Sequence, residues 1–547
     1  MQITVIEYVL SCLDDLGIDD VFGVAGDYAF PIEDAVCNSN TMRWIGNCNE
    51  LNAAYAADGY ARVKGAAALS TTFGVGELSA MNGVAGAYAE NLPIFHLVGM
   101  PASTAQENKK LVHHTLGNGQ FDIFYKMSQN VVCAHAIMTP GNCIEETKRL
   151  IAYALKERKP VYMGFPSDYA VSPVKEQTTT KAVTFLESDP ATLEKAVKKI
   201  VEKLTNSKTA CVMPGILSAR LGFATEVQAI IDQSNLPYTT MFMDKSVLSE
   251  ANPQYIGMYN GHLLNKTVQE YVEHCDCILG IGAMLTDFNT GSFTAQIPNE
   301  RYINIMPDHV KIGLAVYHNI YMKDVLAKLK DSLPKFSMNA PKATGLGEPV
   351  SGKDGKITAE YFYARLEKMF KKDDIIFAET GNSSMGLGFA HLPENAKIYN
   401  QTLWGSIGWA TPAAFGAAVA EPNRRVILIT GEGSHQLTAQ EISQFARFGL
   451  KPIVIVLNND GYLIERLLCN DPETYYNNLA QWNYSELPKA LGCNDWECKQ
   501  VTNCQELDAA IQQAEQSEHA SYIEVKTDRY AASELGEKMK ESKDTLY

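Results

Sequence analysis

Two polar turns toward the end of the chain carry side chains that could hold a metal ion together. The first follows the apolar run Val426–Thr430 and reads GEGS; the second follows Ile453–Leu457 and reads NNDGY. Between them we expect a helix from about Gln436 to Phe448. If both runs are adjacent parallel strands, a carboxylate, an amide and a backbone carbonyl meet at one sheet edge, which predicts Mg²⁺ bridging a diphosphate. Two ordinary surface turns explain these residues alone equally well.

The pair of turns resembles the thiamine-diphosphate motif, which is usually written GDG followed by NN. Here it stands as GEGS and NN, and the following DGY also matches. The resemblance implies that Glu432, Asn459 and the carbonyl of Gly461 hold Mg²⁺, while Gly433 and Ser434 contact the diphosphate. Glu432 is longer by one methylene than the usual Asp. We therefore expect its side chain to fold back, or the turn to shift, so that coordination is retained.

A further carboxylate, Glu50, begins an alanine-rich segment far upstream. A strand-like run, Arg43–Gly46, precedes it, and NELNAAYAADGYAR predicts a helix with Glu50 in its first turn. The helix macrodipole alone often explains a carboxylate at that position. Beside a thiamine motif, however, the segment is similar to the one in which this superfamily carries its activating glutamate. The resemblance implies that Glu50 hydrogen-bonds the pyrimidine ring of the cofactor and promotes its imino tautomer.

Four more groups could transfer protons, namely Asp27, the adjacent pair His113 and His114, and Glu465. Each has a simple structural explanation, because Gly-Asp is a common turn, paired histidines often lie in surface loops, and a helical glutamate is often solvated. Together they resemble the pyruvate-decarboxylase branch of the superfamily, in which a GD near the N-terminus, HHTLG and NNDGYxIE carry active-site groups. The resemblance implies that all four are catalytic.

The same resemblance covers essentially the whole chain and assigns cofactor contacts. Ile407 would be the apolar wedge that bends the cofactor, although plain core packing also explains it, and the Gly405 carbonyl would accept from the pyrimidine amine. Thr380 and Asn382 would line the cofactor end of the last domain. Ile464 is counted with these contacts and with the wall of the substrate pocket.

The substrate side chain is defined less sharply. Phe288 stands where decarboxylases of small oxo acids tend to be aromatic, whereas Ser384 is small where a narrow pyruvate pocket can have Trp. Leu468 should add aliphatic wall beside Ile464. These residues predict an apolar pocket for pyruvate or a modestly larger aliphatic 2-oxo acid.

The elements that must position these groups follow an alternating pattern. Short apolar runs alternate with longer helix-period runs, which is typical of βα units around parallel sheets. Two polar stretches interrupt the pattern, Val174–Lys181 and Pro334–Lys356. We therefore expect an α/β fold of three doubly wound parallel-sheet domains: a pyrimidine-binding domain at 1–173, a central domain at 182–340 and a diphosphate-binding domain at 356–547.

An internal echo suggests that the first and last domains are duplicates. Asn142-Cys143 opens a helical run that leads to the strand Pro160–Phe165, and Asn503-Cys504 opens another that leads to Ala520–Val525. The length of 547 residues is too great for one hydrophobic core and agrees with several domains.

Composition excludes several classes of protein. The net charge of −16 and the lack of a dense basic run argue against nucleic-acid binding. The 12 cysteines are scattered and have no CxxC spacing, which fits a reducing compartment. Met1–Leu16 reads as an amphipathic helix and not a signal peptide, and the uncharged stretch Ile398–Ala420 is too polar for a membrane span. We expect a cytoplasmic protein without membrane contact.

The resemblance predicts a carboxy-lyase that decarboxylates a 2-oxo acid and releases an aldehyde, with thiamine diphosphate and Mg²⁺. In this superfamily the activating glutamate and the diphosphate site come from different subunits, so we expect a homodimer, and the family commonly forms homotetramers. Three alternatives stay open: an indolepyruvate or phenylpyruvate decarboxylase, a flavin-carrying carboligase of the acetolactate-synthase kind, and a non-enzymatic α/β binding module.

Overall fold

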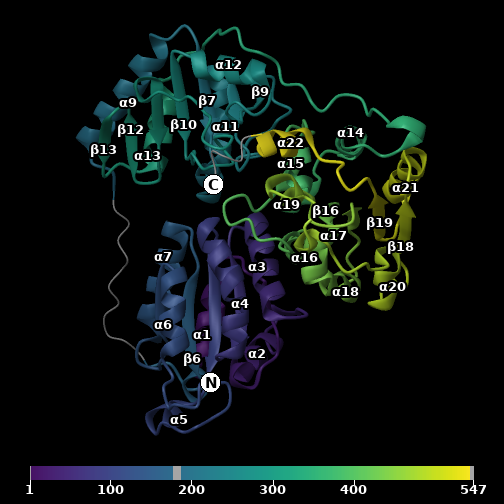
Figure 1. Ribbon diagram of the computed structural model, residues 1–547. Coiled ribbons are helices and arrows are strands. Elements are labelled where there is room, and N and C mark those ends of the chain that lie inside the picture. The colour runs from purple at the N-terminus through teal and green to yellow at the C-terminus, as the bar shows by residue number, and fades with distance from the viewer. Residues whose placement is uncertain (1, 176–186, 542–547) are drawn as a thin grey trace. The chain divides into compact units, whose positions relative to one another are not determined.

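The computed structural model describes residues 2–175 and 187–541, whose strands form three sheets flanked by helices (Figure 1). The expected α/β fold of three parallel-dominated sheets is confirmed. By their internal contacts the described residues form two compact units. The first unit holds the first sheet together with Thr411–Asn423 and Thr438–Leu450, and the second holds the central and third sheets. The domain boundaries at 173, 182, 340 and 356 stay predictions, and most of the polar stretch Val174–Lys181 lies outside the described residues.

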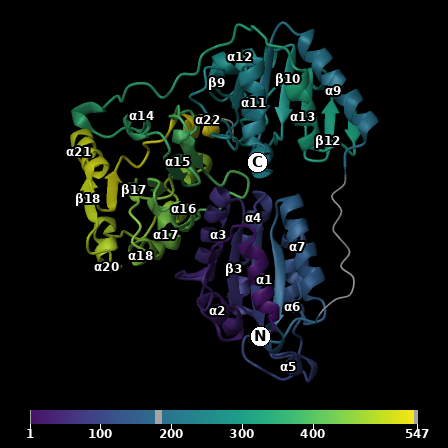
Figure 2. The same ribbon diagram turned by 180° about the vertical axis from the view of Figure 1, so that it is seen from behind.

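The first sheet is six-stranded and parallel, in the order β2-β1-β3-β4-β6-β5. Its strands are β1 Asp20–Gly23, β2 Arg43–Gly46, β3 Ala67–Thr72, β4 Ile94–Met100, β5 Ala134–Ile137 and β6 Val161–Pro166. Its helices are α1 Val5–Asp14, α2 Phe30–Cys37, α3 Glu50–Lys64, α4 Val75–Ala89, α5 Ser103–Glu107, α6 Ile123–Ser128, α7 Cys143–Glu157 and α8 Ser167–Ala170. Helices α1, α2 and α7 share one buried cluster with the strands, whereas α3 and α4 pack against β1 and β3 (Figures 1 and 2). The sheet is therefore doubly wound.

Helix α3 begins and ends where its sequence predicts. The Asn49 side chain caps it by accepting the N–H of Asn52, and Gly65 ends it in the left-handed conformation at φ 95°. Its small residues allow α16 (Ala410–Ala420) to touch it backbone to backbone. A Cβ at Gly59 would lie 1.9 Å from the carbonyl oxygen of Ala413. Any larger residue at Gly59 would push these two helices apart.

The central sheet is seven-stranded, in the order β13-β12-β11-β10-β7-β8-β9. Its strands are β7 Ala210–Pro214, β8 Tyr238–Thr240, β9 Tyr255–Met258, β10 Cys277–Ile281, β11 Tyr302–Ile305, β12 His309–Ile312 and β13 Ala315–His318. Its helices are α9 Pro190–Thr205, α10 Ile216–Arg220, α11 Ala224–Ser234, α12 Lys266–His274 and α13 Met322–Ser332. Strand β12 runs antiparallel to both of its neighbours, β11 and β13, so this sheet is mixed at one edge.

The third sheet is six-stranded and parallel, in the order β15-β14-β16-β17-β19-β18. Its strands are β14 Ile375–Ala378, β15 Lys397–Tyr399, β16 Val426–Gly431, β17 Ile453–Asn458, β18 Glu497–Val501 and β19 Ser521–Lys526. The helices along this part of the chain, besides α16, are α14 Ala359–Met369, α15 Asn382–Leu387, α17 Glu432–Thr438, α18 Ile442–Arg447, α19 Leu463–Leu468, α20 Leu487–Ala490, α21 Cys504–Gln516 and α22 Glu534–Glu541. Of these, α18 and nearly all of α16 belong to the first unit by their contacts. Helices α14 and α21 cover one face of the sheet.

The structure divides one expected helix and agrees with the expected duplication. The helix expected from about Gln436 to Phe448 is instead two helices, α17 and α18, joined by the 3₁₀ turn Ala439–Glu441. The expected duplication agrees with the strand orders, because the first and third sheets have the same topology.

Among the described residues, the helices are all too short or too polar to cross a membrane.

Candidate active site

Three predicted catalytic groups lie together in the first unit. Asp27 follows β1, and His113 and His114 lie in the loop before α6. His113 Nε2 lies 2.6 Å from one carboxylate oxygen of Asp27, and His114 Nε2 lies 3.8 Å from the other. The Tyr28 ring stacks on His113 with 4.8 Å between centroids. All three groups are partly exposed, so this cluster can exchange protons with a molecule that contacts it.

A glycine turn after β3 connects this cluster with Glu50. A Cβ at Gly74 would lie 2.3 Å from the carbonyl oxygen of His114, and a Cβ at Gly76 would lie 3.2 Å from Glu50 Oε1. Gly74 also has a positive φ of 67°. Glycine at both positions therefore lets the Glu50 carboxylate and the histidine loop approach the N-terminus of α4.

Glu77 fixes that glycine turn. Its carboxylate accepts the Gly74 N–H at 2.9 Å and the Tyr162 hydroxyl at 3.0 Å. Burial raises the pKa of Glu77 to about 7, and these hydrogen bonds lower it in part. The buried Glu77 side chain therefore holds the glycine turn in place.

Glu441 holds the start of α3, and sequence reasoning missed it. Its carboxylate accepts from the side-chain amides of Asn47 and Asn52 at 2.7 Å each, and from the Cys48 N–H at 3.3 Å. These three residues bracket Glu50. Because Glu441 lies about 390 positions later in the chain, only the fold brings it there. It is fully buried, and burial raises its pKa.

The three predicted metal ligands lie together in the second unit. Glu432 begins α17, directly after β16, and its Oε1 accepts the N–H groups of Asn459 at 3.2 Å and Gly461 at 2.8 Å. The Asn459 side-chain amide nitrogen donates to Glu432 Oε1 at 3.3 Å and to the Gly461 carbonyl oxygen at 2.8 Å. Burial raises the pKa of Glu432 to about 7, and the two backbone N–H groups lower it. The side chain is folded onto the second turn.

The two turns that hold the predicted metal ligands require glycine at two positions. A Cβ at Gly433 would lie 2.5 Å from the Tyr462 ring, and a Cβ at Gly461 would lie 2.3 Å from the Asn477 carbonyl oxygen. Gly461 also has a positive φ of 138°. Ser434 is buried, and it is the third residue of α17. The Tyr462 ring of the second turn thus packs directly on the backbone of the first turn, and glycine at 433 and 461 leaves the backbone N–H groups of both turns free of shielding Cβ atoms, as a phosphate site requires.

Arg466 adjoins Gly461, and no sequence motif predicted a role for it. Its Nη2 donates to the Asp460 carbonyl at 2.6 Å and to Asn478 Oδ1 at 3.2 Å. Its side chain is buried, and Nε and Nη1 have no hydrogen-bond partner among the described residues. The guanidinium places a positive charge against Gly461, which favours negative charge at the predicted metal and diphosphate site.

Two predicted cofactor contacts leave buried polar atoms free. Thr380 Oγ1 and Asn382 Nδ2 are buried and have no hydrogen-bond partner among the described residues. Asn382 Oδ1 accepts from the N–H and the hydroxyl of Ser533, both at 3.2 Å. A Cβ at Gly381 would lie 3.7 Å from Ile464, so Ile464 of α19 adjoins this turn. Unpaired buried polar atoms are rare, and a polar ligand here would satisfy them.

Gly405 and Ile407 lie in a loop between β15 and α16. Gly405 has a positive φ of 66°, and Ile407 is half-buried. The fully buried Glu379 accepts the N–H groups of Thr380 at 2.9 Å and Ala410 at 3.1 Å, which ties this loop to the turn after β14. Burial raises the pKa of Glu379 to about 7.

The predicted substrate-pocket residues are only partly brought together. Phe288 lies 5.6 Å from the ring of Phe242, and both Phe288 and Ile464 pack against one apolar cluster. The cluster includes residues that sequence reasoning missed: Phe242, Met258, Leu263, Met385, Leu535 and Met539. Ser384 is buried, and its hydroxyl donates to the Gly381 carbonyl at 3.1 Å. Leu468 is half-buried and Glu465 is exposed on α19, and the roles of both stay predictions.

Comparisons with known proteins agree with this geometry. Three family models match: "Thiamine pyrophosphate enzyme, N-terminal TPP binding domain" at residues 3–123, the central domain at 197–333 and the C-terminal TPP binding domain at 379–525. The chain is 37% identical over 526 residues to pyruvate decarboxylase isozyme 3 of Saccharomyces cerevisiae, which covers 94% of this chain and 93% of the relative. Pyruvate decarboxylases of Candida glabrata, at 37% over 525 residues, and Kluyveromyces lactis, at 36% over 512 residues, are similar across more than nine tenths of each chain.

Proposed function

We propose that this chain, which belongs to the family of thiamine-diphosphate-dependent 2-oxo acid decarboxylases, converts pyruvate or a modestly larger aliphatic 2-oxo acid to an aldehyde and carbon dioxide. The observation that carries the proposal is the cluster of Asp27, His113 and His114. Release of an aldehyde requires that a proton be delivered to the carbon that lost carbon dioxide and that a hydroxyl proton be removed afterwards. A carboxylate 2.6 Å from one imidazole is suited to both transfers.

Thiamine diphosphate, when bound, supplies a carbon nucleophile that attacks the 2-oxo carbon and accepts the electrons released with carbon dioxide. The residues of the second unit fit its diphosphate end, because Glu432, Asn459 and Gly461 offer hard oxygen ligands suited to Mg²⁺. The unpaired atoms of Thr380 and Asn382 are suited to its polar groups. We infer Mg²⁺ as the bridging ion.

The other groups act on the pyrimidine and the substrate. In our proposal the Glu50 carboxyl would donate to a pyrimidine ring nitrogen, the Gly405 carbonyl would accept from the pyrimidine amine, and Ile407 would be the apolar wedge that bends the cofactor. The histidine cluster and Glu465 transfer protons on the substrate side. Phe288 and Ile464, which share an apolar cluster, define the pocket for the substrate side chain.

We infer that the active protein is at least a homodimer and that Glu50 of one copy serves the diphosphate site of another. The family's common tetramer is the assembly we propose. We also propose a cytoplasmic location, which suits the scattered free cysteines. Sedimentation of the purified chain with and without cofactor tests the assembly: an active monomer would exclude it.

A panel of 2-oxo acids tests the function. Aldehyde release, followed by coupled reduction, should be fastest with pyruvate or a short aliphatic acid and slower with indolepyruvate and phenylpyruvate. The small side chain of Ser384 favours indolepyruvate and phenylpyruvate. If either of these acids is converted faster than pyruvate and the short aliphatic acids, the protein is an aromatic 2-oxo acid decarboxylase. If the purified chain binds thiamine diphosphate but leaves every acid intact, it is a binding module and the proposal is wrong.

Phe288→Ala should move the preference toward longer or aromatic acids, because the lost ring enlarges the apolar pocket. The selectivity change should be about 1–3 kcal/mol, the range for one methylene-scale difference in a pocket. Phe288→Leu, which keeps most of the volume, is the matched control. An unchanged preference order in the alanine variant would remove Phe288 from the pocket.

The carboligase alternative has a separate test. Acetolactate synthases generally carry flavin, and we expect a protein without the visible absorbance of a flavin. Pyruvate turnover should yield acetaldehyde and little acetolactate. Bound flavin with acetolactate as the main product would support the carboligase.

A further inference from the structure

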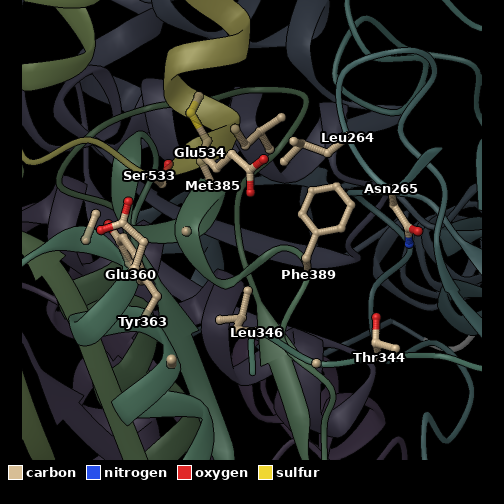
Figure 3. A pocket seen from close by; sticks show the side chains of 15 residues that line it. Leu264, Asn265, Thr344, Leu346, Glu360, Tyr363, Met385, Phe389, Ser533 and Glu534 are labelled. Carbon is tan, nitrogen blue, oxygen red and sulfur yellow. The ribbon is translucent and has the colours of Figure 1, made fainter. Parts of the chain in front are cut away.

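A cavity of about 300 Å³ lies beside α15 in the second unit (Figure 3). Its lining includes none of Phe288, Ser384, Ile464 and Leu468, although Met385, Phe389 and Leu535 belong to the apolar cluster that also contacts Phe288 and Ile464. The first turns of α14 and α22, the helix α15 and the segment 344–346 surround it. Its apolar lining consists mainly of Leu264, Leu346, Tyr363, Met385, Phe389 and Leu535. The volume lies at the lower end of the range for small-molecule sites, which is about 300–1,000 Å³. The cavity therefore suits a small ligand.

The charged residues of this cavity are all acidic. Glu360 and Glu534 are exposed carboxylates in the first turns of α14 and α22. Neither makes a hydrogen bond or an ion pair shorter than 4 Å within the part of the chain that the structure describes, and the described lining includes no lysine or arginine. Lys538, one turn further along α22, is near enough that Glu534 contributes to the raised pKa of the lysine. In Figure 3, Glu360 and Phe389 lie on opposite sides of the opening, and the Glu534 carboxylate points between the side chains. An anion such as a 2-oxo acid is repelled here, so the cavity is not a second site for the substrate.

The remaining lining favours an organic cation with an apolar body. An ammonium group would form charge-assisted hydrogen bonds with Glu360 or Glu534. The half-buried ring of Phe389 offers an aromatic face to the same charge, and Leu264 and Leu346 offer apolar wall to a hydrocarbon body. A cation without an apolar body would leave these two leucine side chains in contact with water.

Two walls of the cavity hold the predicted cofactor residue Asn382. The Tyr363 hydroxyl donates to the Asn382 carbonyl at 2.7 Å, and the Tyr363 ring packs on Gly386, where a Cβ would lie 2.2 Å from it. On the other wall, Ser533 donates to Asn382 Oδ1 at 3.2 Å. A ligand that shifts α14 or α22 therefore changes the hydrogen bonds that orient the free Asn382 Nδ2.

We propose that this cavity binds a small primary amine with an apolar body, and that the bound amine alters cofactor affinity through Asn382. The binding site stands on the cavity and its two carboxylates alone. The coupling rests on the proposed function, because it requires Asn382 to contact thiamine diphosphate.

The binding experiment uses 2-phenylethylamine as the probe and 3-phenylpropanoate as an anion of the same length. Calorimetry on the full chain with thiamine diphosphate and Mg²⁺ should detect the amine. The double variant Glu360→Gln/Glu534→Gln should bind it about tenfold more weakly or worse, as expected when a charge-assisted contact is lost. Glu394→Gln, which neutralises an exposed glutamate paired with Lys372, is the matched control and should bind normally. The anion should not displace the amine.

A second variant closes the cavity without changing its charge. Thr344 is an exposed lining residue, and Thr344→Trp should fill the space and weaken amine binding. No detectable amine binding to the parent, or equal binding to the parent, the double variant and Thr344→Trp, would overturn the site.

The coupling experiment titrates thiamine diphosphate with and without saturating amine. Linkage requires that each ligand change the affinity of the other by the same factor, and we expect about fivefold or more. The change should vanish in the double variant. If the amine binds but leaves cofactor affinity unchanged, the coupling is wrong and the site stands. If the chain binds amine but no thiamine diphosphate, the proposed function fails and not the cavity.

Discussion

The first and third sheets have the same strand order, yet the carboxyl ends of their strands carry different chemistry. In the first sheet, Asp27 follows β1 and Glu50 follows β2, and the side chains of both are partly exposed. In the third sheet, Glu432 follows β16 and Asn459 follows β17, and they are only 3% and 4% exposed. The shared topology places both candidate sites at the carboxyl ends of the strands, and burial separates the partly exposed carboxylates of the first sheet from the enclosed groups of the third. In our proposal the first edge transfers protons and the second holds the cofactor.

Two glutamates make the difference concrete. Glu77 follows β3 and Glu432 follows β16, which are equivalent strands, and burial raises the pKa of each to about 7. Glu77 accepts from Gly74 in its own helix turn and from Tyr162. Glu432 accepts instead from the turn after the neighbouring strand. Glu77 is thus a buried capping residue of α4, whereas Glu432 bridges the two motif turns.

The largest effect should come from the proton-transfer edge. Glu50→Gln should lower turnover by ~10²–10⁴-fold, the range for loss of a general acid or base, and should keep cofactor binding because the side-chain shape is kept. Glu145→Gln, in the first turn of α7, is the control for the macrodipole explanation. Near-normal aldehyde production by Glu50→Gln would remove the assignment.

The histidine cluster should give the next effect. His113→Ala and His114→Ala should each lower turnover by about 10²-fold, the lower end of that range, and leave thiamine-diphosphate affinity unchanged. His309→Ala removes a half-buried histidine that also contacts an aspartate, at 2.7 Å, and should change neither quantity. A large loss of cofactor affinity with normal saturated turnover would show that these histidines bind the cofactor. The proposed difference between the first and third sheets would then be wrong.

The ligand-holding edge should respond in affinity. Glu432→Ala should weaken Mg²⁺-dependent binding of thiamine diphosphate by at least ~10–100-fold, since even indirect partners of metal sites reach that range. Glu432→Asp should keep activity, because a carboxylate remains at the corner. Titrations with and without Mg²⁺ measure both variants. If Glu432→Ala binds as tightly as the parent with the same Mg²⁺ dependence, another group completes the site.

The smallest effect should be on stability at Glu77. Its pKa is raised from 4.5 to about 7 in the folded protein, so the folded state binds more protons than the unfolded state between these values, and stability falls as pH rises through that window. The neutral side chain of Glu77→Gln has no such dependence. The free energy of unfolding of the parent relative to the variant should therefore drop by about 1 kcal/mol or more between pH 5 and pH 8. Parallel pH profiles of the two thermal midpoints would contradict this.

Much of the site could be predicted from local patterns. Strand β2 and the start of α3 lie where the sequence placed them, because an apolar run, a capping Asn49 and a terminal Gly65 act within a few residues of each other. The two turns that contain Glu432 and Asn459 also meet as expected, since adjacent parallel strands end at one edge. The break between α17 and α18 was missed, because helical periodicity does not reveal a single 3₁₀ turn.

The sequence by itself determined the fold class, the alternation of strands and helices, and the residue types at each strand end, because these depend on neighbouring residues and on period. Only the tertiary structure decided which distant groups support them. Glu441 reaches Asn52 across 389 positions, and Ser533 reaches Asn382 across 151. The free energy of such a contact depends on burial and on geometry that many elements set together, and no local pattern records it.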